Sequence, residues 1–195
     1  MASDDSTIQL TIEERVGRLL LRRLSAGNAF TSEMLSQFLE AMARARAEVD
    51  ILVISSAGED FSLGRDRQEP KTGGTPFDAF RLITDVNAAV AGFPGVAVSV
   101  VRGRAFGFAV GMIMRTDIAI AAEDARFALD EVKLGIPPMF IMAEILEHVA
   151  PKSALDIVLS SREFTAAEAR EMGLLSRVVP GERLQASADE LVREL

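Results

Sequence analysis

The stretch from Val96 to Pro138 reads VAVSVVRGRAFGFAVGMIMRTDIAIAAEDARFALDEVKLGIPP. It predicts a buried strand over Val96 to Val101, a glycine-rich turn from Gly103 to Gly107, a helix with small residues on one face, and then an acid. The turn can direct backbone N–H groups outward at the start of the helix, where the helix dipole favours negative charge. This stretch therefore predicts a place that stabilises an anion.

The acid is Glu131, which stands between apolar residues in ALDEVKLGI. Burial in such surroundings disfavours the charged carboxylate and raises its pKa toward the working range of a base. Asp130 adjoins it, but neighbours in an extended segment point to opposite faces, so at most one of the two enters a given pocket. We favour Glu131, and an anion site beside a lone base indicates proton-transfer chemistry.

A second turn, AGEDFSLGRD from Ala57 to Asp66, follows the apolar run ILVIS. Gly64 permits a sharp bend, after which Arg65 can present its backbone N–H. If this turn meets the Gly107 to Phe108 turn, the N–H groups of Arg65 and Phe108 converge on one oxygen, as an oxyanion hole requires. Taken singly, the Ala57 to Asp66 turn is more typical of an ordinary strand exit, and the four-residue glycine spacing is also typical of a closely packed helix face.

Several other chemistries lack support in this sequence. The dinucleotide pattern GxGxxG, the phosphate-binding pattern GxxxxGK[ST] and the nucleophile pattern GxSxG are all absent. His148 is the single histidine and falls in an amphipathic stretch, which favours a helix residue over a catalyst. With no cysteine there is no thiolate nucleophile and no disulfide. We therefore predict no metal site.

The composition, 49% hydrophobic and 26% charged over 195 residues, predicts one globular domain. A net charge of −8 argues against a general nucleic-acid binder, which needs a basic face. The start MASDDSTIQL lacks the features of a signal peptide, and the apolar stretch from Ala105 to Met114 is shorter than the roughly 20 residues that span a bilayer. We expect a soluble, cytoplasmic protein that binds neither nucleic acid nor membrane.

Strand and helix patterns alternate along the chain, as in an α/β fold with a largely parallel sheet. The expected strands are Ile8 to Ile12, Val16 to Leu21, Ile51 to Ser55, Val96 to Val101 and Asp117 to Ala121. The expected helices are one capped by Thr31, then Pro76 to Ala91, Phe140 to Val149, Ser153 to Leu159, Thr165 to Met172 and Glu182 to Leu195. The polar segment Gln68 to Thr75 is expected to be a mobile loop, and the apolar stripe of the last helix needs a partner.

These residues resemble the enoyl-CoA hydratase/isomerase, or crotonase, family over nearly the whole chain. The resemblance lies in SAGNAFT (25–31), DFSLGRD (60–66), VRGRAFGFAVGMIMRTDIAIAAEDARF (101–127), EVKLGIPP (131–138) and SREFTAAEAREMGLLSRVVP (161–180). It implies a crotonase-like α/β spiral of repeated strand-strand-helix (ββα) units over residues 1–137. A C-terminal helical layer over residues 138–195 would complete the same single domain.

The resemblance also implies a ligand, an acyl-CoA whose thioester oxygen binds the N–H groups of Arg65 and Phe108. The other implied substrate-binding positions are Ser62, Leu63, Gly64, Asp66, Gly107, Gly111 and Arg23. Arg22, Arg23, Arg65, Arg67 and Lys71 are the nearest candidates to meet the CoA phosphates, of which we favour Arg23 and Arg65. Coenzyme A enters as part of the substrate, no separate cofactor is implied, and a homotrimer or a dimer of trimers is expected.

Departures from the family pattern bear on the reaction. Gly111 stands where the hydratases carry their first glutamate, whereas Glu131 matches the second. One carboxylate suits moving a double bond from the β,γ to the α,β position, and the local string resembles the single-glutamate enoyl-CoA isomerases. Met139 replaces the aspartate of dienoyl-CoA isomerases, and Phe108 replaces a customary glycine.

Isomerisation is therefore favoured, and two alternatives stay open. One is hydration or another crotonase reaction; the other is a catalytically silent homologue that binds acyl-CoA or serves as an assembly subunit. The chain is also expected to lack the family's last helical segment, which helps to cover the acyl-CoA and to build the trimer.

Overall fold

A computed structural model describes residues 7–70 and 76–195 of the chain. Within these ranges, six strands form the main sheet in the order β1-β2-β3-β4-β6-β9. Only β1 (Ile8–Glu13) runs antiparallel to its neighbour β2 (Val16–Leu21), while β3 (Ile51–Ser56), β4 (Val96–Val101), β6 (Ile118–Ala122) and β9 (Arg177–Val179) continue the sheet in parallel. The α/β class and the crotonase-like spiral are confirmed in this arrangement.

A second, smaller sheet contains β5 (Arg104–Phe106), β7 (Arg126–Ala128) and β8 (Glu163–Thr165). Single bridges extend its ladder, because Ser62 pairs with Ala105 and Arg65 pairs with Phe30. Successive units of the spiral thus contribute to both sheets, one long strand to the main sheet and a short segment to the smaller one. This repetition brings the turn after β3 beside the turn after β5.

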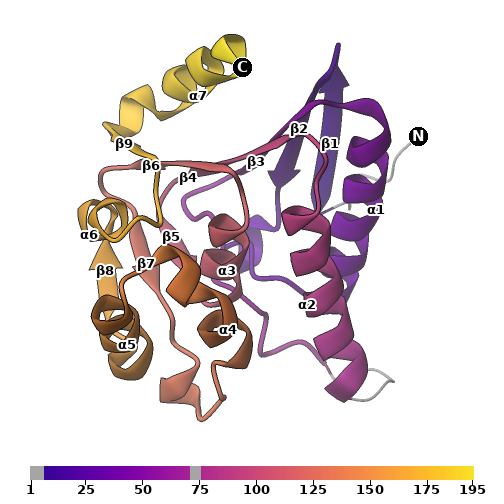
Figure 1. The fold of residues 1–195 in the computed structure, drawn as a ribbon. Helices are drawn as coiled ribbons and strands as arrows, with labels where there is room; N and C mark the ends of the chain where they lie inside the picture. The colour runs from indigo at the N-terminus through magenta and orange to yellow at the C-terminus, as the bar shows by residue number, and fades with distance from the viewer. Residues whose placement is uncertain (1–6, 71–75) are drawn as a thin grey trace.

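Alternate residues of the central strands face two different cores, as the period of a strand requires. In β3, Leu52 and Ile54 belong to the larger core, whereas Val53 belongs to the smaller one on the opposite face. The larger core is covered by α1 (Ser32–Glu48), α2 (Pro76–Ala91) and α3 (Phe108–Met114). Figure 1 shows these helices gathered on one side of the main sheet.

On the other side lies α7 (Leu184–Glu194), which follows a short 3₁₀ turn at Gly181–Arg183. The predicted apolar stripe of this helix does have a partner, and the partner is the sheet itself. Leu184, Ala188 and Leu191 are buried against residues of β3, β4 and β6. The stripe is therefore intramolecular core, not a surface left for another subunit.

Caps and bounds agree closely with the sequence patterns. Thr31 accepts a hydrogen bond from Met34 N at 3.1 Å, which satisfies one free donor at the start of α1. Thr165 and Glu168 form a full capping box at α6 (Ala166–Glu171). Further helices are α4 (Met139–His148) and α5 (Pro151–Ser160), each within two residues of its predicted bounds.

The C-terminal region is less purely helical than predicted. It contributes β8 to the small sheet and β9 to the edge of the main sheet, and neither strand was predicted. Each has only three residues, too few for an alternating pattern to be recognised. Of the predicted loop Gln68 to Thr75, residues 71–75 lie outside the described residues, and so does Lys71.

Candidate functional site

The two glycine turns singled out in the sequence lie against each other. A Cβ atom placed on Gly64 would lie 2.7 Å from Phe106 O and 3.6 Å from Phe108 N. Gly64 has φ +82° and Gly107 has φ +51°, backbone conformations that L side chains rarely adopt. Glycine at position 64 is therefore required both by the backbone angle and by the close approach of the second turn.

The turn that carries Arg65 is held in place by hydrogen bonds on both sides of that residue. Phe30 N donates to Gly64 O at 2.7 Å, and Asp66 N donates to Phe30 O at 2.9 Å. Ser62 Oγ accepts from Gly64 N at 3.1 Å and donates to Asn28 O at 2.7 Å. These contacts fix the bend in the backbone at Gly64.

Two backbone donors are left at the meeting point of the turns. Among the described residues, neither Arg65 N nor Phe108 N donates a hydrogen bond to the protein. Both residues line one cavity of about 310 Å³, which we call the inner cavity. Two such donors are what a developing oxyanion requires.

Glu131 follows β7 and lies beside the Gly107 turn. A Cβ on Gly107 would be 3.4 Å from Glu131 Oε1, and Glu131 Oε2 is buried without a hydrogen-bond partner. Burial raises the pKa of this carboxyl above its ordinary value, and the charge of Asp130 raises it further, while Arg67 opposes the shift. The inner cavity thus combines a desolvated carboxylate with two free N–H donors.

The place of the missing acid is occupied by a cation. A Cβ on Gly111 would lie 3.0 Å from Arg115 Nη1, and this nitrogen donates to Gly111 O at 2.6 Å. The Arg115 side chain is only 5% exposed and pairs with Glu144 at 2.5 Å. Sequence reasoning missed Arg115, although its position four residues after Gly111, at the end of an apolar helix, places it one turn further along the same face.

The glycine spacing has a mixed explanation. Of the three glycines at 103, 107 and 111, only Gly111 lies within α3, so they do not form one small helix face. Gly107 is the N-cap of α3, and Gly103 precedes β5. The alternative reading of a closely packed helix face is therefore wrong for two of the three positions.

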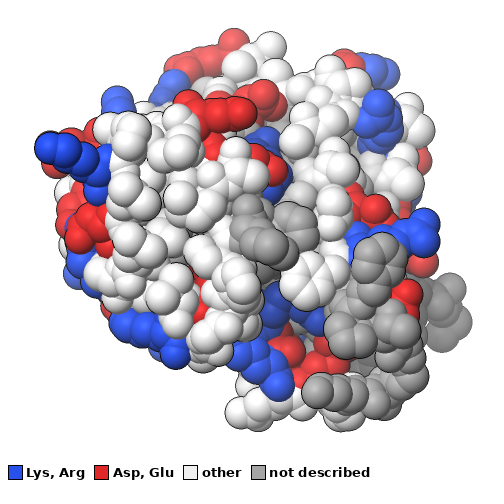
Figure 2. Space-filling view, turned by 60° about the horizontal axis from the view of Figure 1, so that its bottom comes forward, with Lys and Arg blue, Asp and Glu red and all other residues white. Residues whose placement is uncertain are grey.

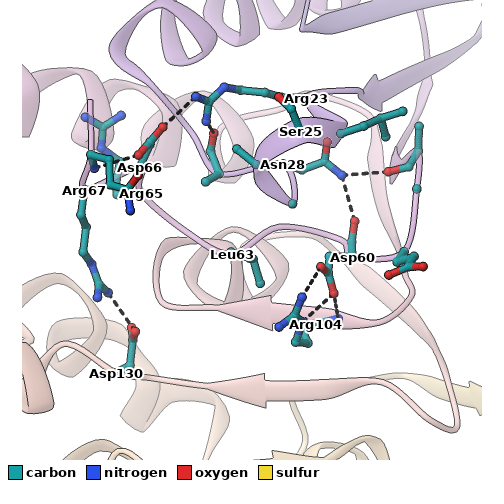
Figure 3. A pocket seen from close by; sticks show the side chains of 18 residues that line it. Arg23, Ser25, Asn28, Asp60, Leu63, Arg65, Asp66, Arg67, Arg104 and Asp130 are labelled. Atoms are coloured by element: carbon teal, nitrogen blue, oxygen red, sulfur yellow. Dashed lines mark hydrogen bonds and ion pairs between the residues drawn. The ribbon is translucent and has the colours of Figure 1, made fainter. Parts of the chain in front are cut away.

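A larger cavity of about 900 Å³, the outer cavity, adjoins the inner one and shares Leu63, Arg65, Arg67 and Asp130 with it. Figure 3 shows Arg23, Arg67 and Arg104 joined to the carboxylates of Asp66, Asp130 and Asp60. The ion pairs are Arg23–Asp66 at 2.7 Å, Arg65–Glu69 at 3.0 Å, Arg67–Asp130 at 2.8 Å and Arg104–Asp60 at 2.7 Å. Arg23 and Arg65 also donate to Ala29 O and Phe30 O.

Arg104 holds the pKa of Asp60 below its ordinary value, because it donates hydrogen bonds to that carboxylate. The face in Figure 2 likewise shows positive and negative side chains intermixed, without a large area of one sign. In the outer cavity the arginines are thus already engaged, so an anionic ligand would compete with acids for them.

The structure therefore places Arg65, Phe108, Gly107, Gly111, Glu131, Leu63 and Gly64 around the inner cavity. Asp130 lines it too, so the expectation that only one of the two neighbouring acids enters a given pocket is wrong, because the backbone at Glu131 is helical and not extended. Arg23 and Asp66 line the outer cavity. Ser62 is fully buried beneath the turn, where it supports the backbone instead of facing either cavity. His148 is an exposed residue at the end of α4 and does not line the inner cavity.

Comparison with known proteins shows the family of the chain. A sequence profile described as enoyl-CoA hydratase/isomerase matches residues 11–195. The chain belongs to the enoyl-CoA hydratase/isomerase family. The resemblance inferred from the sequence motifs is confirmed at this level.

Two relatives illustrate the range of the family. A probable enoyl-CoA hydratase of Mycobacterium bovis is 32% identical over 187 residues, covering 93% of this chain and 72% of the relative. A 1,2-epoxyphenylacetyl-CoA isomerase of Escherichia coli is 30% identical over 193 residues, covering 94% of this chain and 74% of the relative.

Solved structures of the family superpose closely. An enoyl-CoA hydratase of Mycobacterium smegmatis has a TM-score of 0.90 at 26% identity, with 96% of this chain and 76% of that one covered. A putative enoyl-CoA hydratase of Thermobifida fusca, solved in complex with CoA, has a TM-score of 0.86 at 28% identity, with 97% and 78% covered.

Membrane-spanning helices and metal-binding clusters are both absent from the described residues. No helix among residues 7–70 and 76–195 has both the length and the apolar character needed to cross a membrane. No group of three or more His, Cys, Asp or Glu side chains in these ranges is placed to hold a metal ion.

Proposed function

We propose that the chain binds an enoyl-CoA thioester and moves its double bond from the β,γ to the α,β position. The observation that carries the proposal is the pairing of Glu131, partly buried and with a raised pKa, with the two free N–H groups of Arg65 and Phe108 in one cavity. A base next to an anion site is suited to forming and quenching an enolate.

In the proposed reaction, the Glu131 carboxylate takes a proton from the α-carbon of the β,γ-unsaturated thioester. The electron pair of that C–H bond moves toward the thioester oxygen, and the N–H groups of Arg65 and Phe108 stabilise the resulting dienolate. The protonated Glu131 then delivers its proton to the γ-carbon, and the double bond comes to lie between the α- and β-carbons. No atom is gained or lost.

The raised pKa of Glu131 serves both steps. A carboxylate that is poorly solvated is a stronger base toward carbon, and its protonated form is stable enough to hold the proton between the two transfers. Its Oε2 atom makes no hydrogen bond to the protein that a proton transfer would have to break. One group therefore suffices for the whole reaction.

The surroundings of Gly111 favour this reaction over hydration. Hydration requires water to be activated at one carbon and a proton to be added at the other, and the resemblance implies two glutamates for these tasks. Here the position of the first is a glycine packed against Arg115 Nη1, a group that neither removes nor stores a proton at neutral pH.

For the CoA portion we propose the outer cavity, with Arg23 and Arg65 as phosphate partners that exchange a carboxylate for a phosphate. The support is its position next to the inner cavity and the CoA complex of the Thermobifida fusca relative. Coenzyme A would enter with the substrate, and we propose no separate cofactor.

Hydration is the second candidate, because relatives such as the Mycobacterium bovis protein carry the hydratase name. A silent acyl-CoA-binding homologue is the third, since one family acid is missing at Gly111. The assembly-subunit alternative loses one of its two grounds, because Leu184, Ala188 and Leu191 of the apolar stripe of α7 are buried within the chain.

The deciding experiment incubates wild type and Glu131→Gln with a panel of β,γ- and α,β-unsaturated acyl-CoAs, with products resolved by liquid chromatography and mass spectrometry. Conversion at equal mass that disappears in the variant supports isomerisation. A product heavier by one water supports hydration. Binding without any product supports the silent homologue.

A further inference from the structure

The inner cavity contains two polar groups that the proposed reaction does not use. Asn87, on α2, is 8% exposed, and its Oδ1 atom is buried without a hydrogen-bond partner. Arg115, at the C-cap of α3, has a buried Nη2 atom that makes an ion pair with Glu144 but no aligned hydrogen bond. Both residues line the inner cavity, whose other walls are largely apolar.

Buried polar groups without partners are uncommon, because each forgoes the hydrogen bonds it made to water. Here Asn87 Oδ1 is an acceptor without a partner, and Arg115 Nη2 is a donor whose ion pair with Glu144 leaves it without an aligned hydrogen bond. The two residues come from α2 and from the end of α3, and both line the inner cavity. A ligand group that both donates and accepts would satisfy the two at once.

The charges of the cavity argue for a neutral group. Of the described lining residues, Arg65, Arg67 and Arg115 each pair with an acid. A carboxylate on the ligand would therefore add negative charge near Glu131 without a free cation to balance it. A keto oxygen is neutral but only accepts, so it would leave Asn87 Oδ1 unpaired.

A hydroxyl group meets both conditions. We propose that the inner cavity selects acyl-CoA thioesters whose acyl group carries a hydroxyl, which donates to Asn87 Oδ1 and accepts from Arg115 Nη2. This inference rests on the proposed function, since the thioester is taken to bind between Arg65 and Phe108. It adds the chemical class of the acyl group.

Calorimetric titration suits the test, because the chain has neither tryptophan nor tyrosine as an intrinsic fluorophore. Two matched pairs of thioesters without an isolated β,γ double bond serve as probes: hexanoyl-CoA with 6-hydroxyhexanoyl-CoA, and phenylacetyl-CoA with 4-hydroxyphenylacetyl-CoA. Adipoyl-CoA adds a carboxylate probe. The proteins are wild type, Asn87→Leu, Arg115→Met and the control Thr84→Val, which removes an exposed polar group of α2 that does not line the cavity.

The expected result is that the hydroxylated member of at least one pair binds wild type about tenfold more tightly than its parent, the size of one or two buried hydrogen bonds. Asn87→Leu and Arg115→Met each abolish this preference, and Thr84→Val keeps it. If Arg115→Met fails to fold, Asn87→Leu still shows whether the preference for the hydroxylated thioester depends on the inner cavity.

Equal affinities within both pairs, a preference that survives Asn87→Leu, or tightest binding of adipoyl-CoA would each overturn the inference while leaving the proposed function standing. Failure of all five thioesters to bind would instead overturn the proposed function, and the inference with it.

Discussion

The inner and outer cavities share four residues but differ in how many of their buried polar groups have hydrogen-bond partners. In the outer cavity, the arginines at 23, 65, 67 and 104 are all paired with acids. In the inner cavity, Glu131 Oε2 and Asn87 Oδ1 are buried without a hydrogen bond, and the buried Arg115 Nη2 has only its ion pair with Glu144. Among the described outer-cavity residues, Asn28 Oδ1 alone is in that condition, and its amide nitrogen already donates to two carbonyls.

This difference distinguishes groups whose contacts stabilise the fold from groups whose hydrogen bonds a ligand can supply. A paired arginine stabilises the fold, and a ligand must displace its partner. A buried group without a partner is unfavourable in the empty protein and gains when a ligand arrives. Substitutions in the inner cavity should therefore change activity, whereas substitutions of the outer-cavity acids that hold arginines should mainly change stability.

The largest effect is expected at Glu131. Glu131→Gln removes the base but keeps the shape, so turnover should fall by about 10³-fold, within the range of general base catalysis, with little change in acyl-CoA affinity. Product formation measured by mass spectrometry checks this. Glu123→Gln, an exposed acid outside both cavities, serves as the control. Unchanged turnover in Glu131→Gln would show that the unpaired carboxylate is not the base.

The next largest effect is expected at Gly64. In Gly64→Ala the new methyl would meet Phe106 O at 2.7 Å and push the two turns apart, so turnover should fall by about 10²-fold as one oxyanion donor is misplaced. Gly135→Ala is the matched control, because its φ is +69° and a Cβ there meets nothing within 4 Å. If both variants lost activity equally, backbone strain alone would explain the loss, and the clash with Phe106 O would not be its cause.

A smaller effect, on stability, is expected in the outer cavity. Asp60→Asn weakens the contacts with Arg104 and should lower the free energy of unfolding by about 1–2 kcal/mol in urea titrations, with turnover nearly unchanged. Asp50→Asn, in the exposed pair with Arg15, should lower the free energy of unfolding by less.

The pH dependence has a definite sign. Because the pKa of Asp60 is lowered in the folded protein, its contribution is present above the ordinary value of 3.8 and is lost as the pH falls through the lowered pKa. The stability difference between wild type and Asp60→Asn should therefore shrink in strong acid. A difference that grows there would contradict the assignment.

The smallest effect is expected in the pH profile of activity, from Asp130 and Arg67, which line both cavities. The raised pKa of Glu131 predicts that the acid limb of kcat/KM lies above the ordinary value of 4.5, with activity rising as the carboxylate forms. Asp130→Asn removes a charge that raises this pKa and should move the limb down by less than about one unit, whereas Arg67→Leu should move it up. Shifts of the same sign in both variants would contradict this account.

Much of the fold was predictable because its signals are local. The apolar runs at Ile51 and Val96, the cap at Thr31 and the capping box at Thr165 depend on neighbours in sequence. The short strands β8 and β9 depend on distant partners, Phe127 and Ala121 among them, and they carry no pattern of their own.

The site was predictable to a different extent. Glu131, Gly64 and Gly107 stand out because a lone acid in an apolar stretch and glycines at turns are visible in the sequence. Asn87 and Arg115 were missed, because a polar residue on an amphipathic helix ordinarily faces water. Only the tertiary arrangement brings that face of α2 and the end of α3 around one cavity.

The position of α7 has a consequence for how the chain folds. Its apolar stripe covers the far face of β3, β4 and β6, and Asp189 accepts a hydrogen bond from Arg18 across 171 residues of sequence. Contacts of such long range slow folding, because a large loop must close before they form. During synthesis, the second face of the sheet stays open until α7 leaves the ribosome, and a chaperone that holds exposed apolar strands has its longest opportunity to bind there.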